Sequence, residues 1–194
     1  METACVRFAE YRQFHRFNVI GTSGSGKTTF SQQVAEILAI PYVQMDALFW
    51  GPNWYAPRDD EFLPKVQRAL AQDAWVLDGN YTRTIPIKWA QVECVIWLDY
   101  SLWTTMRQAL GRAVRRSISG QELWEGTGNR ESFRRSFMSQ DSIVWYTLRS
   151  HAKTRRRIAA LMTDPQYTGI RFVRLTSRQA ADRFLESLRQ LHQQ

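Results

Sequence analysis

The sequence has few cysteines and no long apolar run. Its two cysteines, Cys5 and Cys94, suit a reducing compartment and do not make a metal site. No stretch reaches the roughly 18 consecutive apolar residues that a membrane-spanning helix needs. The N-terminal residues also lack the basic segment followed by an apolar segment that marks a signal peptide. We therefore expect a cytoplasmic protein with no membrane partner.

Apolar and aromatic residues are plentiful enough to build a core. Hydrophobic residues make up 44% of the 194 residues and aromatic residues 13%, so intrinsic disorder is not expected. The chain length favours one domain, with room for a small inserted lid. Residues 1–15 show no clear periodicity, and we expect them to form an N-terminal extension. The single domain is then expected over residues 16–194.

Positive charge is concentrated in one segment of the chain. The net charge is +8, and residues 107–157 alone contain 12 basic and four acidic residues. The rest of the chain contains 14 of each. Of the 26 basic residues, 22 are arginine, whose planar guanidinium binds phosphate in a bidentate manner. We therefore interpret this segment as a phosphate-binding element.

Apolar runs alternate with segments of helical periodicity. The runs predict five strands, at residues 17–20, 42–45, 74–77, 92–98 and 170–175. Helical spacing predicts helices at residues 27–39, 59–72, 101–116, over much of 131–162, and from 177 onward. Strands that alternate with helices are typical of an α/β protein with a parallel sheet covered on both faces.

A complete phosphate-binding loop follows the first predicted strand. Residues 21–28 read GTSGSGKT and match the pattern G-x-x-x-x-G-K-[ST]. In such a loop the backbone N–H groups surround the phosphates, Lys27 reaches the β- and γ-phosphates, and the Thr28 hydroxyl binds Mg²⁺. We therefore expect ATP and Mg²⁺ as ligands. The expected nucleotide-binding residues are Gly21, Thr22, Ser23, Gly24, Ser25, Gly26, Lys27, Thr28 and Thr29.

Further motifs give the chain a resemblance to the small P-loop kinases. They are residues 45–50 (MDALFW), 76–81 (VLDGNY), 95–99 (VIWLD) and 128–132 (GNRES). Together with the loop, they resemble the adenylate-kinase-related branch, some of whose members are called DNA-topology-modulation proteins. The resemblance covers roughly residues 16–190. It implies a three-layer P-loop fold, a five-stranded parallel sheet in the order 2-3-1-4-5, an arginine-rich lid, and phosphoryl transfer from ATP.

The resemblance does not identify the acceptor of the phosphoryl group. Nucleotide kinases of this family often continue Asp-Gly-Phe-Pro-Arg after the third strand. This chain instead reads DGNYTR at residues 78–83, without the proline and with the arginine one place later. This departure weakens the case for a simple nucleoside monophosphate as the acceptor.

Two aspartates at strand ends compete for the Mg²⁺ shell. Asp78 and Asp99 each end an apolar run, and ligands bind at the carboxyl ends of strands in open parallel sheets. Asp99 directly precedes a predicted helix, so helix capping alone would explain it. We therefore prefer Asp78, together with Thr28, as the metal-binding pair.

The segment after the second strand contains candidates for acceptor binding. In similar kinases an aspartate at the position of Asp46 touches the acceptor hydroxyl, although here it could also cap the next element. Trp50, Trp54 and Tyr55 lack helical spacing and either stack on a ring of the acceptor or cover the sheet edge. Arg58 is either an anion partner or a solvated surface residue.

Arginines in the basic segment are the candidate catalytic cations. Arg112 and Arg116 share one face of the predicted helix, and Arg130 lies farther along a lid expected over residues 112–135. Such cations would stabilise the charge of the transferring phosphoryl group, and lid closure would exclude water. Residues 155–157, all arginine, point in successive helical directions and are interpreted as a solvated face. The predicted catalytic residues are therefore Lys27, Asp46, Arg112, Arg116 and Arg130.

Two functions remain open at this point. The first is a phosphotransferase that moves the γ-phosphoryl group of ATP to a nucleotide or another small molecule. The second is an ATP-dependent regulator that associates with nucleic acid, because the basic segment could contact a phosphate backbone. The sequence has no helix-turn-helix or zinc-finger motif, and the basic residues lie where a lid is expected. We therefore favour the phosphotransferase over nucleic-acid binding and over an ATPase without an acceptor.

Overall fold

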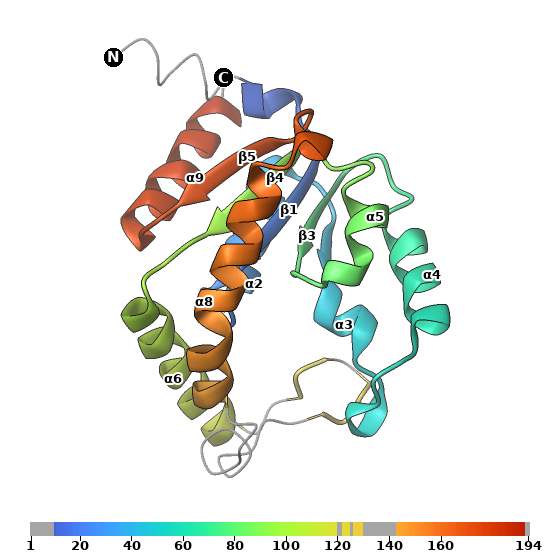
Figure 1. Ribbon diagram of the computed structural model, residues 1–194, viewed down its shortest axis with the longest axis vertical. Helices are drawn as coiled ribbons and strands as arrows, with labels where there is room; N and C mark the ends of the chain where they lie inside the picture. The colour runs from blue at the N-terminus through green and yellow to red at the C-terminus, as the bar shows by residue number, and fades with distance from the viewer. Residues whose placement is uncertain (1–9, 120–121, 125, 130–142, 193–194) are drawn as a thin grey trace.

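Figure 1 shows a central sheet with helices on both sides. The computed structural model describes residues 10–119, 122–124, 126–129 and 143–192. The strands are β1 (Arg16–Gly21), β2 (Tyr42–Gln44), β3 (Trp75–Asp78), β4 (Cys94–Leu98) and β5 (Arg171–Leu175). The longer helices are α2 (Lys27–Leu38), α4 (Asp59–Ala69), α6 (Leu102–Ser119), α8 (Ile143–Met162) and α9 (Arg178–His192). The short ones are α3 (Met45–Phe49), α5 (Ile85–Lys88), η1 (Glu10–Gln13), η2 (Pro52–Trp54), η3 (Thr82–Thr84) and η4 (Pro165–Tyr167).

The sheet has the predicted topology. All neighbouring strands are parallel, and their order is β2-β3-β1-β4-β5. In this order β1 lies at the centre, and Val19 is in register with both Asp78 of β3 and Ile96 of β4. The carboxyl ends of β1 and β3 therefore lie side by side, which brings the loop after β1 next to Asp78.

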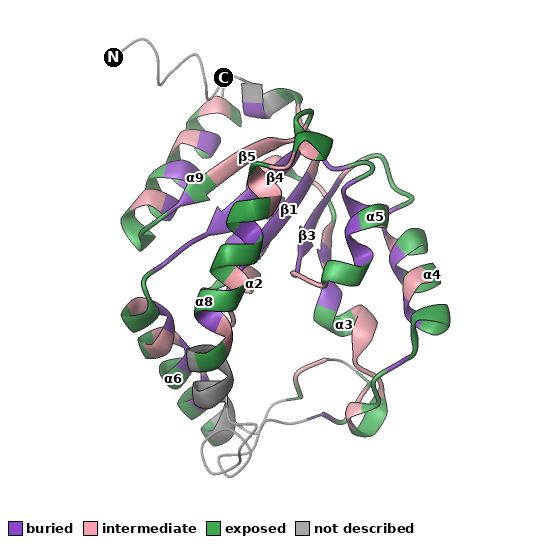
Figure 2. Cartoon of the chain, viewed as in Figure 1, coloured by how far each residue is buried: buried purple, intermediate pink, exposed green. Residues whose placement is uncertain are grey.

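Side chains of the central strands alternate between two core layers. Phe17 and Val19 of β1 pack in one layer with residues of α2 and α9, such as Phe184. Ile20 and residues of the neighbouring strands pack in the other layer with α4 and α8, to which α8 contributes Ile158. Both faces of a parallel sheet are normally covered in this way, and Figure 2 shows the buried strands between partly exposed helices. The predicted three-layer α/β architecture is confirmed.

Two short helices were not expected from the sequence. Helix α3 begins at Met45, which was predicted to end a strand, and α5 spans only four residues, of which Pro86 is the second. Helices this short bury too few side chains to produce a recognisable 3.6-residue period. Both nevertheless shape the site, because α3 carries Asp46 and α5 carries Lys88.

The N-terminal part of the chain is described only from residue 10 onward. Tyr11 is buried and makes an edge-to-face contact with Phe184 of α9, at a centroid distance of 5.4 Å. Residues 1–9 lie outside the described part, so the predicted extension stays a prediction. Within the described residues, no helix combines the length and the apolar character needed to cross a membrane.

Candidate nucleotide and acceptor site

The phosphate-binding loop connects the central strand to α2. Lys27 begins α2, and its Nζ reaches back across the loop to donate a hydrogen bond of 3.0 Å to the carbonyl oxygen of Thr22. Gly24 adopts a φ of +83°, and a Cβ there would lie 2.7 Å from the Cβ of Ala109 in α6. A side chain at Gly24 would therefore be strained and would also push α6 away from the loop. The backbone curvature that a phosphate requires is thus built into the sequence.

Asp78 lies beside this loop as predicted from the sequence. The Thr28 hydroxyl donates a hydrogen bond of 2.7 Å to Oδ2 of Asp78, which the Tyr42 hydroxyl also approaches at 3.4 Å. Asp78 is 5% exposed, and burial raises the pKa of its carboxyl group, while Lys27 and the Thr28 hydrogen bond oppose that rise. A hydroxyl and a carboxylate in contact are oxygen ligands of the type that Mg²⁺ binds together with phosphate oxygens. The pair therefore fits a magnesium ion.

Lys27 lies in a low-dielectric environment close to other charges. Burial lowers the pKa of its ammonium group, whereas Asp78 and Asp46 raise it and Arg112 lowers it further. A triphosphate would add negative charge at this point and would favour the protonated lysine. A bound anion would therefore oppose the effect of burial on the pKa of Lys27.

Asn80 clamps the first glycine of the loop, and nothing in the sequence pattern singles it out for this role. Its Oδ1 accepts a hydrogen bond of 3.0 Å from the Gly21 N–H, and its Nδ2 donates one of 2.6 Å to the Gly21 carbonyl oxygen. Behind it, the fully buried Lys88 donates to the carbonyl oxygens of Gly79 at 3.0 Å and Asn80 at 2.7 Å. Asn18 holds the same turn through Leu77 and Gly79. This network fixes the position of Asp78 relative to the loop.

Lys88 predicts a measurable pH dependence of stability. Burial, assisted by Arg157, lowers its pKa from the model-peptide value of 10.5 to about 7. Between these values the unfolded chain binds one proton more than the folded chain, so the contribution of Lys88 to stability rises with pH; it is lost progressively as pH falls from 10.5 to about 7 and changes little below 7. We expect the free energy of unfolding to gain up to about 1.4 kcal/mol per pH unit from this group between pH 7 and 8.5.

The measurement is urea unfolding of the parent and of Lys88→Met at several pH values in this range. The variant should be less stable throughout, because two buried carbonyl oxygens lose their donor. The slope with pH is the diagnostic quantity, and equal slopes in the two proteins would contradict a lowered pKa at Lys88.

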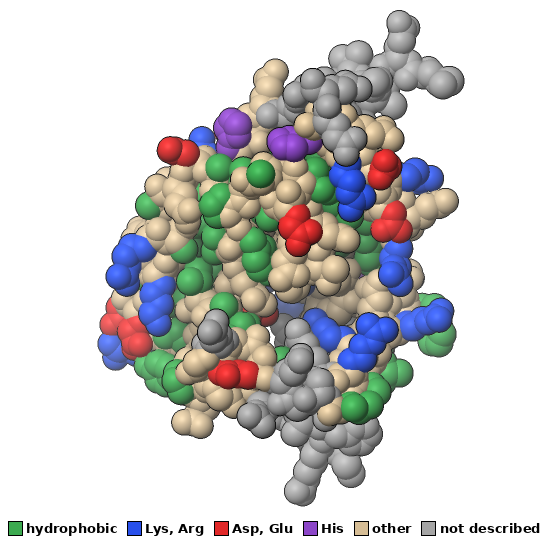
Figure 3. Space-filling view, turned by 180° about the vertical axis from the view of Figure 1, so that it is seen from behind, with side chains coloured by type: hydrophobic (Ala, Val, Ile, Leu, Met, Phe, Trp, Pro, Cys, Tyr) green, Lys and Arg blue, Asp and Glu red, His purple; other side chains and the backbone are tan. Residues whose placement is uncertain are grey.

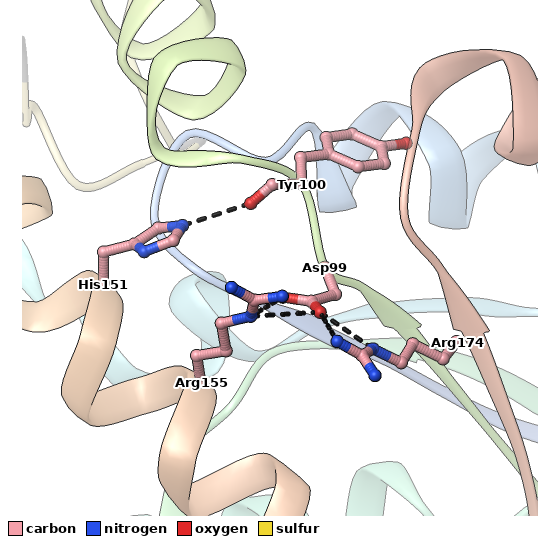
Figure 4. A network of polar contacts seen from close by, with 5 residues as sticks. All are labelled: Asp99, Tyr100, His151, Arg155 and Arg174. Atoms are coloured by element: carbon pink, nitrogen blue, oxygen red, sulfur yellow. Dashed lines mark hydrogen bonds and ion pairs between the residues drawn. The ribbon is translucent and has the colours of Figure 1, made fainter.

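Asp99, the rival metal candidate, is the centre of an ion-pair network. Its carboxylate binds Arg155 of α8, with Nε 2.9 Å from Oδ1, and Arg174 of β5, with Nη2 2.5 Å from Oδ2 (Figure 4). Next to it, Nε2 of His151 lies 3.1 Å from the carbonyl oxygen of Tyr100. Capping was the simple explanation for Asp99, but Ser101 caps α6, because its Oγ accepts from the Thr104 N–H. Asp99 therefore ties α8 to the sheet.

One cavity of about 920 Å³ extends from the phosphate-binding loop to the segment after β2. Lys27, Thr28, Asp78 and Asp46 all line it. Oδ1 of Asp46 accepts a hydrogen bond of 2.7 Å from the Tyr81 hydroxyl. Asp46 is exposed in the first turn of α3, near enough to Lys27 and Asp78 to raise the pKa of both, whereas Trp50 lies at the other end of α3.

The aromatic candidates separate into two groups. Trp50 and Trp54 line the cavity, together with Phe49, Tyr81 and Trp124. Tyr55 is 52% exposed, and its hydroxyl donates to Glu61, outside the residues that line the cavity. Arg58 is also exposed and binds Asp60, with Nη2 2.5 Å from Oδ2. The surface interpretation of Arg58 therefore agrees with its position.

Helices α6 and α8 contribute polar side chains to the same cavity. Arg112 lines it from α6, and Ser150, Thr154 and Arg157 line it from successive turns of α8. Residues 155–157 are all exposed, in line with the expected solvated face, and Arg157 is the one of the three that also lines the cavity. The structure does not describe the side chain of Arg116 or any part of Arg130, so the predicted roles of both lie outside the described residues.

Comparisons with known proteins identify the fold. No protein-family model and no curated protein matches the sequence. A shikimate kinase from Acinetobacter baumannii in complex with shikimate is similar in structure, with a TM-score of 0.54, 16% identity, and coverage of 95% of this chain and 96% of that chain. A gluconokinase from Sinorhizobium meliloti 1021 has a TM-score of 0.51, 15% identity, and coverage of 92% and 91%. A sugar kinase from Janibacter sp. HTCC2649 has a TM-score of 0.47, 17% identity, and coverage of 89% and 91%. The first two structures share the fold of this chain, and at these identities the likeness shows the fold alone; the adenylate-kinase-related branch is not confirmed.

Proposed function

We propose that the protein is a phosphotransferase that moves the γ-phosphoryl group of ATP to a hydroxyl or phosphate group of a small molecule. The observation that carries this proposal is the single cavity lined by Lys27, Thr28, Asp78 and Asp46. The first three are suited to a magnesium–triphosphate complex, and the fourth is suited to an acceptor hydroxyl. An ATPase without an acceptor would have no need of the cavity beyond Asp78.

The residues divide the work of the reaction between the two ends of the cavity. Thr28 and Asp78 would hold Mg²⁺, which supplies charge neutralisation at the phosphates when it is bound. The backbone N–H groups of the loop and Lys27 would orient the β- and γ-phosphates. Asp46 would accept the proton of the attacking hydroxyl, and Arg112 would stabilise negative charge on the transferring group. The lid role of Arg116 and Arg130 is part of the same proposal.

The proposal is tested by an acceptor screen with ATP labelled in the γ-phosphate. The panel comprises nucleoside monophosphates, nucleosides, sugars and sugar acids, each with Mg²⁺. We expect label to move to at least one class of acceptor, and release of labelled phosphate without any labelled acceptor would identify an ATPase instead.

A second test separates the two strand-end aspartates. Asp78→Asn should weaken Mg²⁺-dependent ATP binding by at least about tenfold, because it removes a charged oxygen from the proposed metal shell. Asp99→Asn should leave the Mg²⁺ dependence unchanged but lower the free energy of unfolding by about 1–3 kcal/mol, because a 3%-exposed carboxylate with two arginine partners loses its charge.

The measurement is ATP binding by calorimetry over a series of Mg²⁺ concentrations, with urea unfolding of each variant. A larger loss of Mg²⁺ dependence in Asp99→Asn than in Asp78→Asn would reverse the assignment.

A further inference from the structure

The end of the cavity beyond Asp46 is lined by tryptophan. Trp50 and Trp124 are nearly parallel, with an interplanar angle of 19° and a centroid distance of 6.4 Å. Trp54 meets both rings edge-on, at 5.6 Å from Trp50 and 5.7 Å from Trp124. All three rings are partly exposed and line the cavity. They form a tryptophan cluster, defined here as Trp50, Trp54 and Trp124.

The cluster is assembled from two segments that are far apart in the sequence. Asn129 is 1% exposed and binds the loop after α3 with both ends of its amide. Its Oδ1 accepts a hydrogen bond of 2.8 Å from the Trp54 N–H, and its Nδ2 donates one of 2.9 Å to the Gly51 carbonyl oxygen. The Leu123 N–H in turn donates to the Asn129 carbonyl oxygen at 2.8 Å. These hydrogen bonds bring Trp124 against Trp50 and Trp54. Figure 1 shows the segment that contains Trp124 and the loop after α3 meeting below α3.

Covering the edge of the sheet does not account for the cluster. Phe49, unlike the three tryptophans, packs against the core on this side of the sheet, and its ring meets the buried Phe62 edge-to-face at 5.0 Å. Arg83 lies over both phenylalanine rings, at 4.9 Å from each centroid, and binds Asp59. The tryptophan cluster lies on the cavity side of this layer. Without a bound ligand, the three large rings would leave apolar area facing water.

We propose that the tryptophan cluster is an acceptor subsite for an alcohol that carries a ring with an apolar face. This inference rests on the proposed phosphotransferase function and adds the substrate class. The ring would lie on the tryptophans, because their π faces bind planar rings and the C–H faces of saturated rings. Its hydroxyl would reach Asp46, between the cluster and the phosphates. Asn129 is a positioning residue, because it acts through Trp54 and Trp124.

The transfer step balances with the groups present. The acceptor oxygen forms a bond to the γ-phosphorus, and the bond between that phosphorus and the β–γ bridging oxygen breaks. ADP leaves with the electron pair of that bond, and the hydroxyl proton passes to the carboxylate of Asp46. No oxidant, reductant or further co-reactant is needed.

The test compares a cyclic acceptor with an open-chain acceptor of the same size and number of hydroxyl groups. myo-Inositol and sorbitol each have six carbons and six hydroxyl groups, but only the first is cyclic. Adenosine and glucose are added to distinguish a nucleoside from a carbohydrate ring. Phosphoryl transfer is followed by the label that passes from γ-labelled ATP with Mg²⁺ to each acceptor, because hydrolysis alone would also release ADP. Binding of each compound is followed by calorimetry in the presence of a non-hydrolysable ATP analogue.

Variants of the cluster test whether any preference for a cyclic acceptor depends on the tryptophans. Trp54→Leu and Trp124→Leu should each raise the KM for the preferred ring compound about tenfold, without a change in the KM for ATP. Asn129→Asp replaces the donor that faces the Gly51 carbonyl by an acceptor, and should act in the same way. Trp103→Leu is the matched control, because Trp103 is 78% exposed on α6 and does not line the cavity.

Each outcome decides the proposal. Preference for a cyclic compound, lost in the cluster variants but kept in Trp103→Leu, supports it. Equal or better use of sorbitol, or unchanged KM values in the cluster variants, overturns it while phosphoryl transfer itself stands. Failure of every cyclic compound to bind also overturns it. Binding of a cyclic compound without transfer would instead support the subsite and contradict the phosphotransferase proposal.

Discussion

Lys27→Ala is expected to abolish productive ATP binding while the fold remains intact. The Nζ of Lys27 lies over the phosphate-binding loop and donates a hydrogen bond to the Thr22 carbonyl oxygen of that loop. Among the described residues, no other lysine lines the cavity. Its removal leaves the developing phosphate charge without its nearest cation. A loss in turnover on the order of 10²–10³-fold is expected from the removal of one preorganised donor of this kind.

The fold should tolerate this change, because Lys27 is at the start of α2 and α2 is held by apolar contacts. Phe30 and Val34 of α2 are buried in the core layer shared with α9. Binding is measured with a fluorescent ATP analogue, and folding by thermal unfolding. Lys65→Ala, on the exposed face of α4, removes the same charge outside the cavity and should bind ATP as the parent does. Equal turnover in Lys27→Ala and the parent would contradict the nucleotide site.

The sheet and the loop were predictable because their signals are local. Buried strands of a parallel sheet appear as short apolar runs, and all five runs became strands within a few residues of the predicted bounds. The phosphate-binding loop requires glycine and lysine at fixed spacing, so a few adjacent residues specify it. The position of Asp78 at the end of a strand was predictable in the same way, while its role at the metal stays a prediction.

The residues that hold the site in place could not be predicted, because their roles depend on contacts with residues far away in the sequence. Asn80 binds Gly21 across 59 positions, and Asn129 binds Gly51 across 78. An isolated asparagine is typical of a turn, and nothing in its sequence neighbours reveals a distant backbone partner. Lys88 was equally hidden, since a lysine is expected at the surface and its burial becomes apparent only in the fold. The position of Arg157 at the cavity was also hidden, because its two neighbours in the sequence are arginines as well.

Asp99 shows how one pattern can have two causes. A carboxylate between a strand and a helix is typical of a cap, and Ser101, two positions later, performs that function. The partners of Asp99, Arg155 and Arg174, follow it by 56 and 75 positions. The ion pairs hold α8 in place, and α8 presents Arg157 to the cavity.

Replacing Arg112 and Arg116 together by glutamine should lower kcat with only a modest change in ATP affinity. Arg112 lines the cavity, and its proximity lowers the pKa of Lys27, so the two cations are close enough to act on the same anion. Cations of a lid act on the charge of the transition state more than on bound ATP. The expected loss is on the order of 10²-fold or more if one of them acts as an arginine finger.

The same variant separates the phosphotransferase from a nucleic-acid-binding regulator. If α6 instead contacts a phosphate backbone, ATP turnover should persist in the variant. A plot of the logarithm of DNA affinity against the logarithm of salt concentration should then become less steep, by about one unit of slope for each phosphate contact removed. Figure 3 shows basic side chains on the face that it draws, some of them next to one another and others set apart among neutral and acidic side chains.

The matched control is the double replacement of Arg107 and Arg115 by glutamine. Both are exposed on α6 and lie outside the residues that line the cavity, so this variant loses the same charge from the same helix. A lid role predicts loss of turnover in the Arg112–Arg116 variant alone. Nucleic-acid binding predicts similar losses of salt slope in both variants with turnover unchanged. We expect the first result, because only Arg112 among the described arginines of α6 lines the cavity that contains Lys27, Asp46 and Asp78.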